Sequence, residues 1–212
     1  MRRGPVIAID GPAAAGKGTL ARRIATTLGL PYLDTGLLYR AVGRRVLDAG
    51  GDPADPKVAE EAAKVLRAAD LERSDLRGPD ADAAAAAVAA TPAVRVALLD
   101  FQRNFATERG AVLDGRDIGT VIFPDAPVKL YVTASLGARA YRRWLELQAK
   151  GVTADPTTVE ADMLARDSRD APNMLQAEDA ELVDTTNLDA DAAYTCAMGI
   201  VRRSLAARCG SR

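Results

Sequence analysis

The stretch Ile9–Thr19 (IDGPAAAGKGT) combines glycines, small residues and a lysine in a spacing that suits phosphate binding. Gly11 and Gly16 let the backbone turn so that successive N–H groups point inward, where they can hold a polyphosphate. Lys17 begins a predicted helix, within reach of the β- and γ-phosphates of a nucleoside triphosphate, and the helix dipole adds to the attraction. The motif predicts a nucleotide-binding loop formed by Gly11, Pro12, Ala13, Ala14, Ala15, Gly16, Lys17, Gly18 and Thr19.

A second group of charged residues follows the third predicted strand, in the segment DGRDIGT. Asp114 occupies the place where proteins with such a loop carry the acidic residue that supports Mg²⁺. The hydroxyl of Thr19 comes one place later than in the general loop pattern, so its direct contact with the metal stays open. Arg116 and Asp117 form either a surface ion pair or a functional pair, and their place beside a phosphate centre favours the second alternative.

A third polar group stands in LDTGLLYR, after the second predicted strand. Asp34 and Thr35 precede a helix, where these residue types also make ordinary N-terminal caps. Tyr39 and Arg40 come one turn later, so they can face the same cleft as Thr35. A guanidinium beside a hydroxyl and a phenol is a plausible cradle for a phosphate and a sugar.

Arginines cluster on two predicted helices near the C-terminal third of the chain. Gly151–Thr158 is loop-rich and lies between these helices, which predicts a lid that closes and excludes water. The arginines of the first helix either form a solvated face or converge, and we expect at least one of them to reach the triphosphate. The arginines concerned are Arg139, Arg142 and Arg143 on the first helix and Arg166 and Arg169 on the second.

Short apolar runs alternate with helical stretches along the whole chain. Strands are expected at Val6–Ile9, Tyr32–Leu33, Ala111–Leu113, Val128–Val132 and Leu182–Val183. Helices are expected at Lys17–Leu28, Leu37–Ala49, Asp55–Ala69, Ala83–Ala90, Ala93–Glu108, Leu136–Lys150, Thr158–Arg169 and Asp189–Ala207. The alternation predicts a doubly wound, parallel α/β sheet of five strands, with ligands beyond the carboxyl ends of the strands, where the polar groups stand.

Composition removes several classes of function. The 212 residues include no histidine, which excludes His-based triads and His-ligated metal sites. The net charge of −1 argues against nonspecific nucleic-acid binding. Cys196 and Cys209 are thirteen residues apart on one predicted helix, too far for a disulfide. Since the sequence shows neither an apolar run of about 18 residues nor a secretory signal, we expect a cytoplasmic protein without a membrane partner.

Five segments together resemble bacterial cytidylate kinases, the CMP/dCMP kinases among the nucleoside monophosphate kinases. These segments are GPAAAGKGT, LDTGLLYR, PAVRVALLDFQRNFA, LDGRDIGTVIFPDAPVKLYV and ARDSRD with DAELVDTT. The similarity runs from residue 6 to about residue 187 in the family's order, and the block GRDIGTVIFPDA is highly specific to this family.

The resemblance implies a P-loop NTPase-type fold: a single kinase domain over residues 1–212, with a CMP-binding subregion at about 35–95 and a lid at about 139–175. It implies transfer of the γ-phosphoryl group of ATP to CMP or dCMP with Mg²⁺, in pyrimidine metabolism. The loop Gly11–Thr19 would bind ATP. The partners would be small molecules, with neither nucleic acid nor membrane, and the chain would be a monomer.

The resemblance also assigns residues to the acceptor nucleotide. Thr35, Tyr39 and Arg40 would contact the sugar and phosphate of CMP. The other implied contacts are Arg95 and Asp117 with cytosine, Arg116 with phosphate, and Arg166 and Asp170 with the ribose and phosphate region. Cytosine offers an amino donor to a carboxylate, whereas uracil presents a carbonyl oxygen at the same position. The carboxylate of Asp117 would therefore reject uracil.

The implied reaction fits a chain without an obvious catalytic base. A monophosphate acceptor is already anionic, so transfer needs alignment and charge neutralisation, for which the catalytic residues would be Lys17, Arg116 and Arg166. Two departures from the family pattern are Ala86, where a serine is usual, and Asn173, where many members carry an arginine. Another small P-loop kinase and a nucleotide-binding regulatory protein remain alternatives, whereas the absence of an N-K-x-D motif disfavours a GTPase.

Overall fold

The computed structural model describes residues 4–106 and 109–210, with side chains described up to residue 207. The chain divides into two compact units. The first contains the residues up to Leu33 and those from Ala106 onward, and the second is Asp34–Phe105.

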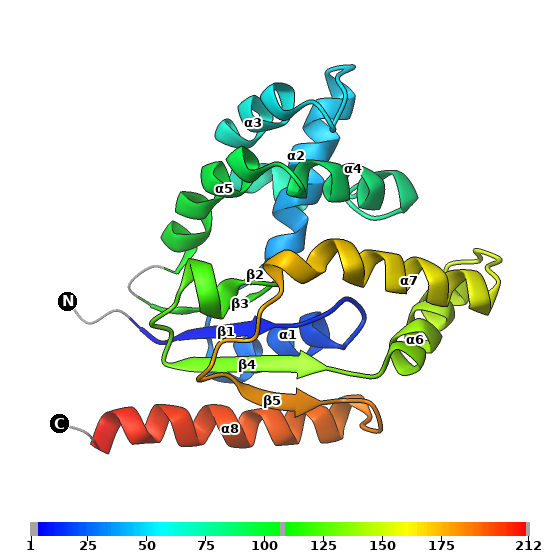
Figure 1. The fold of residues 1–212 in the computed structure, drawn as a ribbon. Coiled ribbons are helices and arrows are strands. Elements are labelled where there is room, and N and C mark those ends of the chain that lie inside the picture. The colour runs from blue at the N-terminus through cyan, green and yellow to red at the C-terminus, as the bar shows by residue number, and fades with distance from the viewer. Residues whose placement is uncertain (1–3, 107–108, 211–212) are drawn as a thin grey trace. The chain divides into compact units, whose positions relative to one another are not determined.

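The first unit is built on a parallel sheet (Figure 1). Its strands are β1 (Val6–Asp10), β2 (Tyr32–Asp34), β3 (Ala111–Asp114), β4 (Val128–Thr133) and β5 (Glu181–Asp184), in the order β2-β3-β1-β4-β5. β2 ends on the first residue of the second unit. β1 pairs in parallel with β3 and β4, and β4 with β5, so Asp10 and Asp114 end neighbouring strands at the same edge. The predicted five-stranded α/β fold is confirmed.

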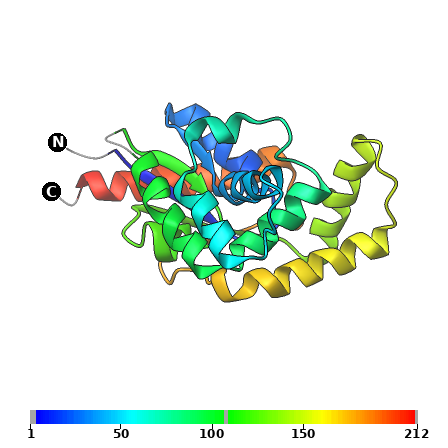
Figure 2. The same cartoon turned by 90° about the horizontal axis from the view of Figure 1, so that it is seen from above.

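Four α-helices belong to the first unit: α1 (Lys17–Leu28), α6 (Leu136–Ala149), α7 (Pro156–Asp170) and α8 (Ala190–Gly210). α1 and α8 pack against each other and against the sheet, with α8 beside β5 (Figure 1). The β-branched strand residues predicted to be buried, such as Ile7, Ile9 and Val132, form one core with Ile24 of α1 and Val201 of α8. α6 and α7 contact each other and are joined by residues 150–155 (Figure 2).

The second unit is helical. It contains α2 (Thr35–Asp48), α3 (Pro56–Lys64), α4 (Pro79–Ala89) and α5 (Pro92–Phe105), with a short 3₁₀ helix at Ala68–Glu72. The alanine-rich segment forms α4, as its helix propensity predicts. α4 packs along α2 and buries Ala81, Ala84 and Val88, so the unit gets its core from small side chains.

The helix predicted over Ala83–Ala90 begins earlier, at Pro79, and several other ends shift by one or two residues. Three further predicted elements differ from the structure. The helix expected over Asp55–Ala69 ends at Lys64, because Asp70 accepts from the backbone N–H of Arg67 and pairs with Arg45, which favours a separate 3₁₀ turn. The polar turn expected after β3 continues into a π-helix at Ile118–Ile122. The helix expected to end at Glu108 ends at Phe105 as α5, and Glu108 lies outside the described residues.

Within the described ranges, no single helix has the length and apolar character to cross a membrane. Only α4 and α5 taken together meet such a test, as a pair bent by 100°. Both cysteine positions fall in α8, and Cys196 is a free, exposed thiol. The side chain of Cys209 lies outside the described residues.

Candidate active site

The loop between β1 and α1 has the strand–loop–helix context that its sequence predicts. Gly11 adopts a φ of 136°, and a Cβ atom there would lie 2.0 Å from the carbonyl oxygen of Val132, so only glycine fits. Ala14 has a φ of 57°, a conformation that costs energy for a residue with a side chain and that is found at functional sites. The backbone is thus held in a curled shape before any ligand binds.

Two arginines of α6 and one threonine hold this loop from outside. The hydroxyl of Thr185 donates to the carbonyl oxygen of Ala15 at 3.0 Å, and Arg142 donates to that hydroxyl at 3.0 Å. The guanidinium of Arg139 donates to the carbonyl oxygen of Ala13 at 3.3 Å. These contacts fix the carbonyls on the outer side of the loop, which leaves its N–H groups for a ligand.

Lys17 is buried at the first turn of α1, where its Nζ donates to the carbonyl oxygen of Pro12 at 2.7 Å. Burial, and next the positive charge of Arg116, lower the pKa of Lys17 to about 7, while Asp114 and Asp10 act in the opposite direction. A bound polyphosphate would favour the charged ammonium, since an opposite charge raises the pKa of an amine. The protein alone therefore does not fully stabilise the charged form of Lys17, and a bound anion would stabilise it.

Asp114 is the carboxylate best placed for a metal ion. It is buried at the end of β3 and accepts a hydrogen bond from the hydroxyl of Tyr32 at 2.8 Å. Its other oxygen lies 3.8 Å from the position that a Cβ atom on Gly18 would take, which places it beside the nucleotide loop. Among the described residues no group of three or more acidic, Cys or His side chains could hold an ion. A single carboxylate beside the nucleotide loop suits Mg²⁺, which usually keeps several water ligands and binds phosphate oxygens.

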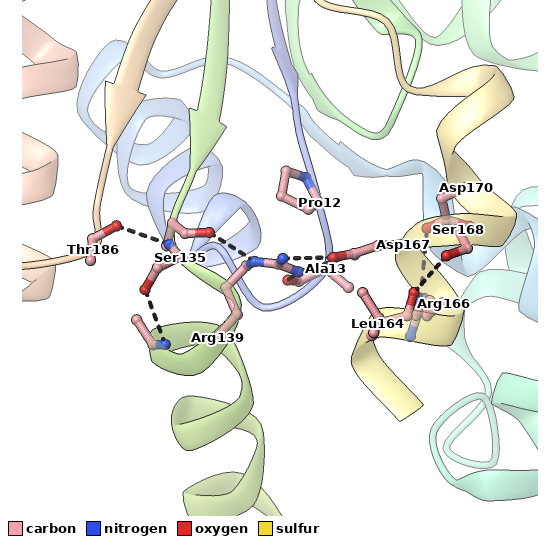
Figure 3. Close-up of polar contacts among 12 residues, drawn as sticks. Pro12, Ala13, Ser135, Arg139, Leu164, Arg166, Asp167, Ser168, Asp170 and Thr186 are labelled. Atoms are coloured by element: carbon pink, nitrogen blue, oxygen red, sulfur yellow. Dashed lines mark hydrogen bonds and ion pairs between the residues drawn. The ribbon is translucent and has the colours of Figure 1, made fainter. Parts of the chain in front are cut away.

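Arg116, Arg166 and Asp170 form a charged cluster in the first unit. The Nε of Arg116 donates to Asp170 at 2.8 Å. The Nε of Arg166 lies 3.9 Å from the same carboxylate oxygen, and Figure 3 shows Arg166 and Asp170 together on α7. Asp117, also predicted to bind substrate, is buried at the start of the π-helix. Two guanidinium groups beside one carboxylate give this cluster an excess of positive charge, which favours an anion.

The arginines of α6 have three different environments. Arg139 is buried and forms a bidentate ion pair with Asp167 of α7 (Figure 3). Its Nη1 and Nη2 donate to the two carboxylate oxygens at 3.0 and 2.6 Å. Arg142 contacts Thr185, whereas Arg143, which is partly buried, pairs with Glu146 on its own helix. Arg139 is thus the one of the three that contacts the nucleotide loop directly, at Ala13, whereas contact of any of them with a triphosphate stays a prediction. Arg169 of α7 is exposed.

The second unit carries the other predicted substrate residues. Thr35 is buried in the first turn of α2, and Asp34 caps that helix by accepting from the N–H of Gly36 at 3.0 Å. The guanidinium of Arg95 lies 5.9 Å from the ring centroid of Tyr39. Arg40 donates to the carbonyl oxygen of Leu76 at 3.1 Å and pairs with Asp82 at 2.5 Å.

The sequence model of the family described as "Cytidylate kinase" matches residues 7–202. The cytidylate kinase of Granulibacter bethesdensis is 63% identical over 93% of this chain and 97% of its own. That of Acidiphilium cryptum is 60% identical over 97% of this chain and 99% of its own.

The chain belongs to the cytidylate kinase family. The resemblance seen in the sequence is thereby confirmed, and the chain is a phosphotransferase with ATP as its co-substrate. The fold is also similar to that of a gluconokinase from Sinorhizobium meliloti 1021, with a TM-score of 0.55, 14% identity and coverage of 100% of both chains. At that identity the likeness concerns the fold alone.

Within this cytidylate kinase fold, each unit gathers its own set of predicted residues. The first unit brings together Lys17, Asp114, Arg116, Arg166 and Asp170, whose charges act on one another. The second unit brings Arg95 to Tyr39 and places Thr35 and Arg40 on the same helix.

Sequence reasoning missed three residues that shape these groups. Asp10 ends β1 next to the loop, and its place among the strand-end polar residues was the available signal. Thr185 follows β5 in a polar DTT segment. Asp82 carried no signal, because its pairing with Arg40 joins two helices distant in sequence.

Proposed function

We propose that the chain transfers the γ-phosphoryl group of ATP to CMP or dCMP, giving ADP and CDP or dCDP, as a step of pyrimidine nucleotide metabolism. The observation that carries the mechanism is the group of charges around the buried Lys17, whose pKa is lowered by burial and by the positive charges of Arg116 and Arg166. A phosphoryl group in transfer would supply the negative charge that favours the charged ammonium.

On the ATP side, the curled loop Gly11–Thr19 would bind the phosphates through its N–H groups. Lys17 would leave the carbonyl oxygen of Pro12 and bind the β- and γ-phosphates. The acceptor is an anionic phosphate, so no side chain must remove a proton. The protein's task is then to align the two phosphates and to balance their charge.

Mg²⁺ fits the carboxylate of Asp114, which would hold the ion through water, while the exposed hydroxyl of Thr19 is a further candidate ligand. The ion would neutralise charge on the phosphates when bound. The hydroxyl of Tyr32 orients the carboxylate of Asp114 beside the nucleotide loop, where it would face the hydrated metal.

On the CMP side, the assignments follow the family pattern. Thr35, Tyr39 and Arg40 would contact the sugar and phosphate, and Arg95 and Asp117 would read cytosine. The phosphate and ribose would further be bound by Arg116, Arg166 and Asp170. The residues at about 35–95 would form the CMP-binding part of a single kinase domain.

Residues at about 139–175, which include α6 and α7, would form a lid. The ion pair between Arg139 and Asp167 joins the two helices, and Arg139 also contacts the nucleotide loop at Ala13. A triphosphate on that loop would compete with Asp167 for the guanidinium and so couple ATP binding to lid movement. The chain would work as a monomer on small molecules in the cytoplasm, where ATP and CMP are available.

Initial rates of ADP formation with CMP, dCMP, UMP, AMP and GMP test this proposal. ADP release that depends on CMP or dCMP and is far slower with the other monophosphates is expected. A preference for another monophosphate would identify a different small P-loop kinase. ADP release at the same low rate with and without every acceptor would indicate a nucleotide-binding protein without transferase activity.

A further inference from the structure

Asp10, the last residue of β1, contacts a segment that lies far away in the sequence. One carboxylate oxygen accepts from the N–H of Ile118 at 2.8 Å and the other from the N–H of Gly119 at 2.7 Å. The residue is only 5% exposed. The two oxygens therefore clamp two successive amides of the π-helix Ile118–Ile122, directly after Arg116 and Asp117.

The residues around this clamp leave little space. A Cβ atom on Gly119 would lie 3.3 Å from the carboxylate of Asp10 and 3.1 Å from the side chain of Lys129, so glycine permits the close approach. Lys129, buried on β4, donates to the carbonyl oxygen of Pro124 just beyond the π-helix, and to Asp179 at 2.8 Å. The segment is thus fastened at its start by Asp10 and just past its end by Lys129.

We propose that Asp10 is a positioning residue for the acceptor nucleotide, because its carboxylate fixes the segment that presents Arg116 and Asp117. The inference rests on the proposed function for the roles of these two residues. Asp10 directly precedes Gly11, so a single residue links the nucleotide loop to the acceptor-side segment.

Two observations support a functional reason for the carboxylate. π-Helical turns are rare and are often found at functional sites. Burial raises the pKa of Asp10 to about 6, although both N–H bonds lower it, so the charged clamp is held at a cost in free energy. A neutral side chain at position 10 would avoid the cost of burying a charge, but it would hold the segment less firmly. The buried carboxylate therefore indicates that the position of the segment matters.

Asp10→Asn is the informative variant. Asparagine has one oxygen, and its amino group would face an N–H donor, so one of the two amides loses its acceptor. Asp189→Asn is the matched control, since its carboxylate also accepts from two amides, those of Asp191 and Ala192, but through the same oxygen. An asparagine there can keep both bonds.

The experiment measures three quantities for wild type and both variants: amide hydrogen exchange at residues 118–119, CMP affinity beside a non-hydrolysable ATP analogue, and the affinity for that analogue alone. For Asp10→Asn we expect faster exchange, CMP affinity lower by on the order of tenfold, and affinity for the analogue within about twofold of wild type. The control Asp189→Asn should change none of the three.

Gly119→Ala is the second variant, for the case that Asp10→Asn does not fold. It pushes against the same carboxylate from the other side and should weaken CMP binding in the same selective way. Wild-type CMP affinity in faster-exchanging variants would overturn the inference, as would unchanged exchange in Asp10→Asn or equal loss of both affinities. Turnover of CMP by the wild type tests the proposed function separately, so the two failures are distinguishable.

Discussion

The two units prepare their charged side chains in different ways. In the first, Asp114 ends β3, Asp117 lies in the segment that follows it, Lys17 begins the helix after the β1 loop, and all three are buried. In the second, Arg40 and its partner Asp82 stand on helices, and each side chain is 21% exposed. Strand ends fix side chains through the sheet, whereas helix surfaces let them pair with one another. The buried groups of the first unit are therefore held in place before a ligand binds, whereas the proposed binding of phosphate by Arg40 in the second unit would displace the carboxylate of Asp82.

The largest loss of activity is expected from a change in the nucleotide loop, where the side chains are held in place before a substrate binds. Lys17→Ala removes a buried cation aimed at the transferring group and should lower kcat/KM by roughly a thousandfold while the fold is kept. Lys57→Ala, which removes an exposed lysine of α3, is the control and should be unaffected. Near-normal turnover of Lys17→Ala at an unchanged melting temperature would show that the loop is not the phosphoryl-transfer site.

The next effect concerns the base. The asparagine of Asp117→Asn carries a hydrogen-bond donor and can turn its amide toward either an amino group or a carbonyl. The kcat/KM for CMP should therefore fall. The CMP/UMP ratio of kcat/KM should also fall, by a factor equivalent to about 1–3 kcal/mol in transition-state free energy. Arg95→Ala should weaken CMP without improving UMP. Equal loss for both substrates in Asp117→Asn would mean that this carboxylate supports Arg116 rather than reading the base.

The buried clamp should be visible in stability as well. The pKa of Asp10 is raised from 3.8 to about 6 by burial, so the folded state holds its proton more tightly than the unfolded chain. Its contribution to the free energy of unfolding is therefore complete below about pH 4 and falls as the pH rises to about 6.

Asp10→Asn lacks this titration, so its stability relative to wild type should increase over that pH range, by about 1–3 kcal/mol. The pKa of Asp10 is also influenced by the charges of Asp117 and Lys17, and the side chain of Lys129 packs nearby. Denaturant unfolding of wild type and Asp10→Asn is therefore compared at each pH. A pH-independent difference would mean that Asp10 is not held as a buried charge.

The smallest effect belongs to the second unit. Asp82→Asn removes the carboxylate charge beside Arg40 and should lower the KM for CMP by roughly twofold to fivefold, since ion pairs that keep contact with water are weak. Asp80→Asn, an exposed neighbour on the same helix, is the matched control. An increased KM in Asp82→Asn would show that Asp82 orients Arg40 rather than competing for it.

Local patterns predicted most of the strands and the nucleotide loop, because glycine spacing and β-branched runs act over a few residues. Local patterns did not predict the π-helix, whose first amide donates to Asp10, a residue 108 positions earlier in the chain. The pairing of Arg40 with Asp82 depends on how two helices pack. Family resemblance supplied roles for residues in both units, but only three-dimensional contacts show which of them are already paired.

The most direct test of phosphoryl transfer follows ATP, CMP and Mg²⁺ by phosphorus NMR with the wild-type protein. Transfer between two phosphates predicts that ADP and CDP appear in equal amounts, with no inorganic phosphate. Release of inorganic phosphate without CDP would contradict the account, because it would show that the nucleotide loop serves hydrolysis rather than transfer.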